Sequence, residues 1–251
     1  MPRPPASTTS ASAILPLAAA YNQYIDVARD SAYDAGAEAA QMILRPLFAT
    51  SFLLADYLAT NDYFGAQALV VSSASSKTAY GTALLVYREE KRPRLIGLTS
   101  PGNVEFTKGL GCYDDVFAYD AAGGLPNNVK AVYADFSGNA KLRRTIHERF
   151  GEILVASIAV GMTDWSEMSQ TEQLPGPTPS FFFAPSHLRK AGGWGAGGFV
   201  AQFAEAWGKL REGLRGALEI KEERGPEPVE RVYRALLEGR DDPRLGHVLS
   251  L

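Results

Sequence analysis

One segment of the chain concentrates side chains that could bind phosphate. It begins at Ser72, directly after the apolar run Ala68–Val71. Small residues let a backbone approach a pyrophosphate, and the N-terminus of a following helix offers free amides and positive potential. The side chains available for direct phosphate contacts are those of Ser73, Ser75, Ser76, Lys77 and Thr78. The alternative is a turn whose serines only cap the helix, because the segment matches neither GxGxxG nor the Walker A pattern.

A second polar group follows the next apolar run, Arg94–Leu98, and consists of Thr99, Ser100 and Asn103. An Asp or Glu at this point would hold the ribose 2′-hydroxyl of NAD and would repel a 2′-phosphate. No acidic residue stands there, which favours NADPH, with the three polar side chains as neighbours of its phosphate. Ser100 precedes a proline, so it is expected to cap a helix in either case.

Both groups fall within an alternation of apolar strands and helices. The predicted strands of this alternation are Ala68–Ser73, Arg94–Leu98, Val116–Tyr119, Val129–Phe136, Ile153–Val160 and Phe181–Ala184. Strands that are apolar along their whole length are buried on both faces, which requires helices on both sides of a parallel sheet. With right-handed crossovers, the sequence predicts a doubly wound α/β sheet of the Rossmann type, which binds its ligands at the carboxyl ends of the strands.

Helices are predicted between and after these strands. Their expected positions are a helix that begins after Pro46, then Ala79–Tyr87, Ser100–Gly109, Ala140–Phe150, Phe199–Leu214 and Pro228–Leu237. Phe199, Phe203 and Trp207 recur at helical spacing and give their helix an apolar face. A final strand is expected over His247–Leu251.

Composition excludes several classes of function. The 251 residues carry a net charge of −3, which gives no general attraction for nucleic acid. A single cysteine and three widely spaced histidines argue against an internal disulfide and against a zinc site. Residues 1–12 are rich in Pro, Ser and Thr and predict a disordered leader. Prolines interrupt the Ala-rich start and no uninterrupted apolar run reaches about 18 residues, so a cytoplasmic protein without a membrane segment is expected.

The order and spacing of these motifs resemble the cofactor domain of medium-chain dehydrogenase/reductases, nearest the quinone-oxidoreductase and enoyl-reductase branch. The matching segments are Leu47–Ser51, Ala74–Lys77, Gly97–Ser100, Leu110–Val116, Asp135–Gly138, Val160–Thr163 and Val229–Leu251. The chain resembles still more closely an uncharacterised offshoot of that superfamily, known only as a domain of unknown function. Short sequence segments typical of the offshoot are YNQY, RPLFATSF, ASSKTA, GLTS and FFAPS.

The resemblance implies a division of the chain. Residues 13–40 would be a truncated remnant of the GroES-like catalytic domain, 41–185 the nucleotide-binding domain, and 186–251 C-terminal helices and a terminal strand. Only the last piece of a domain of roughly a hundred residues fits ahead of the cofactor domain. The family's turn glycines are also replaced, by Ser73, Ser76 and Ala79.

The resemblance also implies further site residues. Ser137, Gly161, Thr163 and Phe183 would lie near the cofactor, and Tyr21, Asn22 and Tyr24 would lie where the two domains join. Phenols and amides of this kind can hydrogen-bond a carbonyl or an enolate oxygen, although aromatic packing is an equal alternative for them.

Two functions follow from this pattern. The first is an NADPH-dependent oxidoreductase that transfers hydride to a small-molecule substrate with an activated C=C bond or a quinone or carbonyl group. The second is a catalytically reduced or inactive nucleotide-binding or scaffold relative of such enzymes. The terminal strand and the Trp207 helix would lack the partners that a full catalytic domain provides, so a homo-oligomer is expected.

Overall fold

The computed structural model describes residues 26–30, 33–160, 173–188, 198–214 and 216–251, and divides into two compact units, Met1–Tyr33 and Asp34–Leu251. In the first unit, the Asp26 carboxylate accepts a hydrogen bond of 3.0 Å from the amide of Ala28 and caps a short 3-10 turn. All features described below belong to the second unit.

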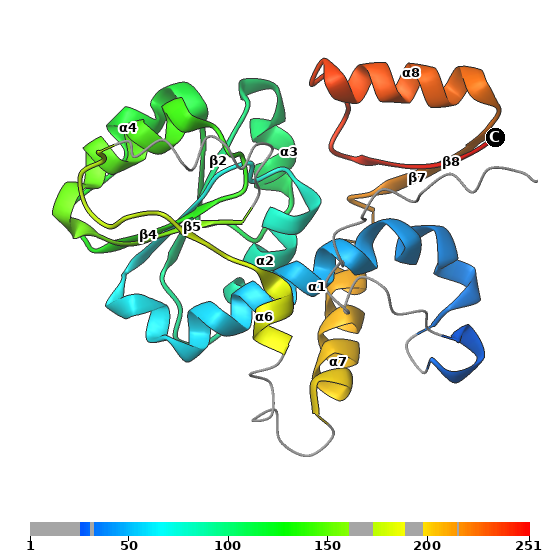
Figure 1. Cartoon of the computed structure of the whole chain (residues 1–251), viewed down its shortest axis with the longest axis horizontal. Coiled ribbons are helices and arrows are strands. Elements are labelled where there is room, and N and C mark those ends of the chain that lie inside the picture. The colour runs from blue at the N-terminus through cyan, green and yellow to red at the C-terminus, as the bar shows by residue number, and fades with distance from the viewer. Residues whose placement is uncertain (1–25, 31–32, 161–172, 189–197, 215) are drawn as a thin grey trace, which may run out of the picture. The chain divides into compact units, whose positions relative to one another are not determined.

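A six-stranded parallel sheet forms the centre of this unit (Figure 1). Its strands are β1 (Ala68–Val71), β2 (Arg94–Thr99), β3 (Asp115–Ala118), β4 (Ala131–Asp135), β5 (Leu154–Ala159) and β6 (Ser180–Phe181). They lie in the order β3-β2-β1-β4-β5-β6, and each neighbouring pair is parallel. This is the strand order of a Rossmann fold, with the direction of the crossovers reversing between β1 and β4. The predicted fold class is confirmed.

Helices cover both faces of the sheet. The α-helices are α1 (Glu38–Thr60), α2 (Lys77–Tyr87), α3 (Val104–Gly109), α4 (Ala140–Phe150), α6 (Ala184–Leu188), α7 (Gly198–Gly213) and α8 (Pro226–Leu237). The 3-10 turns of this unit are η3 (Ala35–Ala37), η4 (Asp62–Gly65), η5 (Pro101–Asn103), η6 (Tyr119–Gly124) and η7 (Gly151–Ile153). Side chains of α1 and α2 pack on one face of the sheet, and side chains of α4 and η6 pack on the other.

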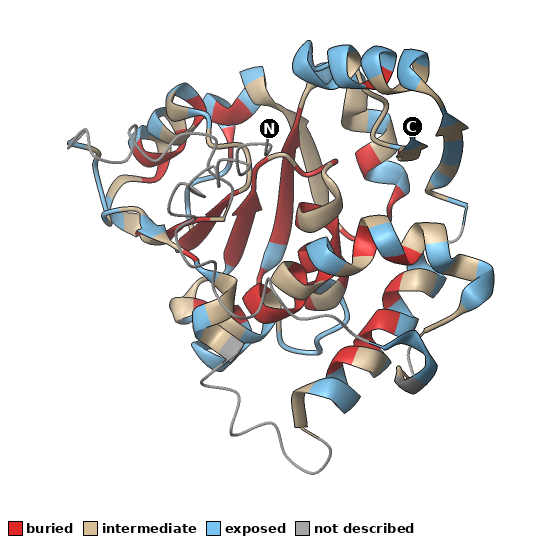
Figure 2. Ribbon diagram, turned by 45° about the vertical axis from the view of Figure 1, so that its right-hand side comes forward, coloured by how far each residue is buried: buried red, intermediate tan, exposed pale blue. Residues whose placement is uncertain are grey.

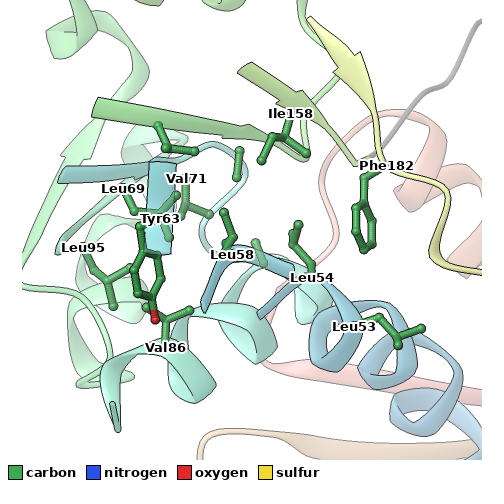
Figure 3. Close-up of a cluster of buried hydrophobic side chains, with 13 residues drawn as sticks. Leu53, Leu54, Leu58, Tyr63, Leu69, Val71, Val86, Leu95, Ile158 and Phe182 are labelled. Atoms are coloured by element: carbon green, nitrogen blue, oxygen red, sulfur yellow. The ribbon is translucent and has the colours of Figure 1, made fainter. Parts of the chain in front are cut away.

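The central strands β1 and β4 are buried along their whole length, which matches their apolar sequences (Figure 2). On the α1 face, Leu54 and Leu58 pack with Leu69 and Val71 of β1 (Figure 3). Burial of apolar surface on both faces is the main favourable contribution to such a sheet, at about 25 cal/mol per Å² removed from water.

The predicted start of the first long helix was wrong. Helix α1 begins at Glu38, and Pro46 lies inside it. Proline lacks the amide that would bond to the carbonyl four residues earlier, which usually ends a helix. Here Leu44 and Phe48, on either side of the proline, are both buried, so packing keeps the segment helical.

One helix of the described residues, Ala35–Thr60, is long and apolar enough to cross a membrane by length and composition alone. The core helix of a soluble protein passes the same test, and 44% of the tested window is buried inside this unit.

The C-terminal part contains a strand that the sequence did not reveal. Strand β7 (Glu219–Arg224) pairs in parallel with β8 (Leu245–Ser250), and α8 connects them. Five of the six residues of β7 are charged, so neither alternation nor an apolar run marked it as a strand. The terminal strand therefore has a partner within the chain.

Helix α7 is also better covered than expected. Trp207 is only 2% exposed, and its ring centroid lies 5.5 Å from that of Phe48 on α1. Phe203 packs against the same ring at 5.3 Å. The aromatic face of α7 is thus buried against α1, and the expectation that it lies partly uncovered is corrected.

Close packing of α1 on α2 generates a stability prediction. A Cβ atom at Gly81 would lie 2.7 Å from Ser51 Oγ, which itself donates to the carbonyl of Thr78 at 2.8 Å. We expect Gly81→Ala to destabilise the protein by about 1–3 kcal/mol, because overpacking exceeds the gain in helix propensity. Urea denaturation followed by circular dichroism measures the effect.

Gly208 in α7 provides the matched control, because a Cβ atom there meets no heavy atom within 4 Å. Gly208→Ala should stabilise the protein by up to about 1 kcal/mol. Equal effects of the two substitutions would contradict the close approach of α1 to α2.

Candidate functional site at the carboxyl ends of the strands

The turn between β1 and α2 has a glycine-like backbone without glycine. Ser73 has a φ of 50°, in the left-handed region that non-glycine residues rarely adopt. The amide of Ser76 donates to the Ser73 carbonyl at 2.7 Å, and the amide of Ala74 donates to the Leu98 carbonyl at 2.9 Å. These bonds fix the turn against the end of β2.

Tyr113 contacts both the turn and β2. Its hydroxyl donates to the Ala74 carbonyl at 3.0 Å. Its ring packs over Gly97 of β2, where a Cβ atom would lie 3.0 Å from the Tyr113 ring and 3.0 Å from the Cβ of Ala74. Burial raises the pKa of Tyr113 well above its ordinary value, so the phenol remains a hydrogen-bond donor.

Three of the predicted polar residues come together beside this turn. Thr99 Oγ1 donates to Ser75 Oγ at 3.0 Å, and Asn103 Nδ2 donates to the same oxygen at 3.3 Å. Thr99 and Ser75 are 1% and 7% exposed. The ends of β1 and β2 therefore share a polar cluster, and the sequence 97–103 places no carboxylate in it.

The N-terminus of α2 directly follows this turn. Ser76 is the N-cap residue of α2, and its side chain caps no amide of the helix. The interpretation of the serines as helix caps therefore does not describe Ser76. Uncapped amides and the helix dipole give this end of α2 a positive potential that suits an anion.

A buried carboxylate joins the ends of β1 and β4. Asp135, which is 1% exposed, accepts hydrogen bonds at Oδ1 from Ser72 Oγ (2.8 Å), Ser137 Oγ (2.8 Å), and the amides of Ser137 (3.0 Å) and Gly138 (3.1 Å). Ser72 Oγ accepts in turn from the amides of Phe136 and Ser137, at 2.9 and 3.1 Å. We call Ser72, Asp135 and Ser137 the β1–β4 lock.

Further polar side chains surround the lock. Arg143 of α4 places Nη1 3.4 Å from Asp135 Oδ2, and its charge partly offsets the cost of burying the carboxylate. Tyr133 is fully buried beside Ser72 and Asp135, and burial raises the pKa of its phenol well above the ordinary value. Tyr119 lies beside Ser73, and burial raises the pKa of its phenol as well.

Lys77 has a different position from the one expected. Its ammonium donates to the carbonyl of Leu245 at 2.8 Å and to that of Pro243 at 3.5 Å. Burial lowers the pKa of Lys77, while Asp241 and Asp242 oppose this shift. In this structure Lys77 therefore holds β8 against the start of α2, and its contact with a phosphate stays a prediction.

The other predicted residues are dispersed or lie outside the described part of the chain. Phe183 follows β6 at the sheet edge, is 40% exposed, and stacks on Phe181 at 6.4 Å. Ser100 precedes η5 next to Thr99, and Thr78 lies in the first turn of α2. The predicted residues that fall outside the described residues are Tyr21, Asn22, Tyr24, Gly161 and Thr163.

Sequence reasoning did not assign a site role to Asp135, Tyr113, Tyr119 or Arg143. One signal could have identified Asp135: it is a carboxylate directly after an apolar strand, at the carboxyl end where parallel strands place functional groups. The tyrosines carry no such signal, because their contacts depend on the packing of three strands.

The residues present fit the phosphates of a dinucleotide. The positive φ of Ser73 keeps the turn conformation that glycine usually provides, and the first amides of α2 face no capping side chain. The hydroxyl of Ser75, which accepts from Thr99 and Asn103, and the second hydrogen of the Asn103 amide supply donors beside the turn.

These features define an α/β protein of the Rossmann type with a polar site at the topological switch point. The chain belongs to the family described as "Protein of unknown function (DUF2855)", whose model matches residues 7–242. A search among curated proteins gave no match.

Solved structures share the fold. A putative NADPH:quinone reductase from Mesorhizobium loti superposes with a TM-score of 0.54 at 13% identity, over 86% of this chain and 60% of that chain. The yhdH oxidoreductase from Salmonella enterica in complex with NADP gives 0.49 at 13% identity, over 81% and 60% of the two chains. YhdH of E. coli K-12 with bound NADPH gives 0.49 at 16% identity, over 79% and 59%. The chain thus spans about 60% of the length of these structures.

The position of Lys77 generates a prediction for β8. We expect Lys77→Met to increase amide hydrogen exchange of residues 245–250 about fivefold, equivalent to about 1 kcal/mol for one lost charge-assisted hydrogen bond. Hydrogen exchange measured by mass spectrometry tests this.

Lys221→Met is the matched control, because Lys221 is an exposed residue of β7 that lies 4.0 Å from Glu219. It should leave the exchange of β8 unchanged. Unchanged exchange in Lys77→Met as well would show that the ammonium does not hold the strand.

Proposed function

We propose that this chain binds NADPH at the carboxyl ends of β1 and β2 and acts as an NADPH-dependent reductase of a small molecule. The observation that carries the proposal is the cluster of Ser75, Thr99 and Asn103 next to the uncapped N-terminus of α2. The cluster offers neutral donors where an NAD-specific site would place a carboxylate.

We propose a role in cofactor binding for each of these groups. The amides at the start of α2 would bind the pyrophosphate, and the Ser75 cluster would lie beside the adenosine ribose and its 2′-phosphate. The β1–β4 lock holds the start of the turn that leads into α2. Arg143 balances the charge of Asp135, so the two side chains together add no net positive charge. The nicotinamide ring of a bound cofactor would supply the hydride.

The substrate proposed is an activated C=C bond or a quinone or carbonyl compound. Tyr21, Asn22 and Tyr24 are the proposed donors to its oxygen atom. A putative NADPH:quinone reductase from Mesorhizobium loti, which superposes on this chain with a TM-score of 0.54, supports this class of substrate.

A second candidate function is nucleotide binding without turnover. It is favoured by the β1–β4 lock, in which Asp135 already occupies the amides of Ser137 and Gly138 at the switch point. The two candidates differ in whether reduced nicotinamide is consumed when quinones and enones are added, which absorbance measures directly.

The absence of a carboxylate at the end of β2 generates a prediction. We expect NADPH to bind about tenfold or more tightly than NADH in calorimetric titrations, a difference of about 1.4 kcal/mol. Ser100→Asp should weaken NADPH binding by about tenfold or more through repulsion of the 2′-phosphate, and should leave NADH binding unchanged or stronger.

Ser186→Asp is the matched control, since Ser186 is an exposed residue of α6 that gains the same charge. It should not change the preference between the two nucleotides. A clear preference of the unmodified chain for NADH, or equal effects of the two substitutions, would refute NADPH as the cofactor.

We also propose that the chain forms a homodimer through its C-terminal strands and α8. Among the described residues, β7 and β8 pair only with one another, which leaves an open edge on each. Tyr233, Leu236 and Leu237 of α8 are 62%, 57% and 70% exposed and lie on neighbouring positions of the helix.

Light scattering over a concentration series tests the dimer. We expect the mass of a dimer for the unmodified chain and that of a monomer for Leu237→Lys, because a charge in an apolar interface is costly. Val200→Lys is the control, as Val200 is 71% exposed on α7. A monomer at all concentrations would exclude the interface.

A further inference from the structure

A cavity of about 480 Å³ lies between α1, α2 and α7, near the end of α2 that is farthest from the nucleotide site. Helix α2 begins at the proposed nucleotide turn and ends at Tyr87, and the cavity is formed by its last turn together with α1 and α7. Phe52, Leu85, Val86 and Ala206 form apolar walls. The volume is within the usual range of about 300–1,000 Å³ for small-molecule sites.

A strained turn forms part of this cavity. Asp62, Tyr63 and Phe64 have φ values of 49°, 47° and 57°, and Gly65 follows at 69°. Left-handed conformations are unfavourable for residues other than glycine. Such strain persists where the surrounding structure requires it, often at binding sites. Here the turn places the Tyr63 side chain in the wall of the cavity.

Tyr63 carries a buried hydroxyl without a hydrogen-bond partner among the described residues. The side chain is 6% exposed and points from η4 toward Val86 of α2 (Figure 3). Burial, with a further contribution from Glu89, raises the pKa of Tyr63 to about 12. The phenol is therefore a donor at neutral pH, and a buried donor without a partner costs stability. A ligand oxygen would remove this cost.

Charges at the rim limit the ligand further. Asp56, Glu89 and Glu205 supply carboxylates, against Arg88 and Lys209. Lys209 is paired with Glu205 at 2.5 Å, which leaves an excess of negative charge around the opening. An anionic ligand would be repelled, whereas a neutral ligand would avoid this repulsion.

We infer that this cavity is a second binding site, for a neutral, largely apolar molecule whose oxygen accepts a hydrogen bond from Tyr63. The site is independent of the nucleotide turn and would bind its ligand whether or not a cofactor is bound. Its walls come from three helices, and the buried hydroxyl of Tyr63 comes from the strained turn between α1 and β1.

Ligand-observed NMR titration of the full chain with acetophenone tests the site, since acetophenone is a neutral aromatic ketone. We expect saturable binding in the millimolar range or tighter. Ethylbenzene lacks the acceptor and benzoate carries a negative charge, so both should bind more weakly. Tyr63→Phe keeps the ring and should weaken acetophenone binding by about two- to tenfold, while leaving ethylbenzene unchanged.

Two further variants complete the test. Tyr87→Phe removes an exposed phenol at the end of α2 that does not line the cavity, and it should not change any affinity. Ala59→Leu adds volume to the cavity wall and should abolish acetophenone binding, with circular dichroism showing that the fold is retained. Absence of acetophenone binding to the unmodified chain, or unchanged affinity in Tyr63→Phe and Ala59→Leu, would overturn the inference. NADPH affinity is not expected to change in Tyr63→Phe, so the result is separate from the test of the proposed function.

Discussion

The buried carboxylate of Asp135 links the carboxyl ends of β1 and β4, the two paired strands at which the halves of the sheet meet. Crossovers from β1 run one way and those from β4 run the other, so the ends of these two strands have no helix directly above them. Ser72 bridges the gap by donating to Asp135 and by accepting two amides that follow β4. The turn that leads into α2 starts from Ser72, and its geometry therefore depends on this bond.

A glycine-free turn follows from the same constraint. Ser73 is left-handed although it carries a Cβ atom. It lies between Ser72 of the lock and Ala74, whose amide donates to the Leu98 carbonyl, so the backbone is held on both sides. Tyr113 then occupies the space beneath the turn, which requires the glycine at position 97. A backbone conformation that glycine usually adopts is thus found here at a residue with a Cβ atom, held by the contacts around it.

Much of the fold was predictable from the sequence, since burial on both faces leaves a direct trace in strands such as Ala68–Val71 and Ala131–Asp135. The helix boundary at Pro46 and the charged strand β7 were not, because each depends on tertiary packing that overrides local preference. Within the site, the hydroxyl groups of Ser75 and Thr99 could be placed from their positions after strands. The hydrogen-bond partners of Lys77 could not be predicted, because they lie more than 160 residues away in the chain.

The contact of Lys77 with β8 has a consequence for which positions can accept substitution. Its ammonium binds main-chain oxygens, and every amino acid carries one. Positions 243 and 245 are therefore unconstrained by this contact, whereas position 77 must provide a long, flexible cation. The side chains at positions 243 and 245 can therefore change while β8 stays attached to α2. Substitution of Lys77 itself removes the contact.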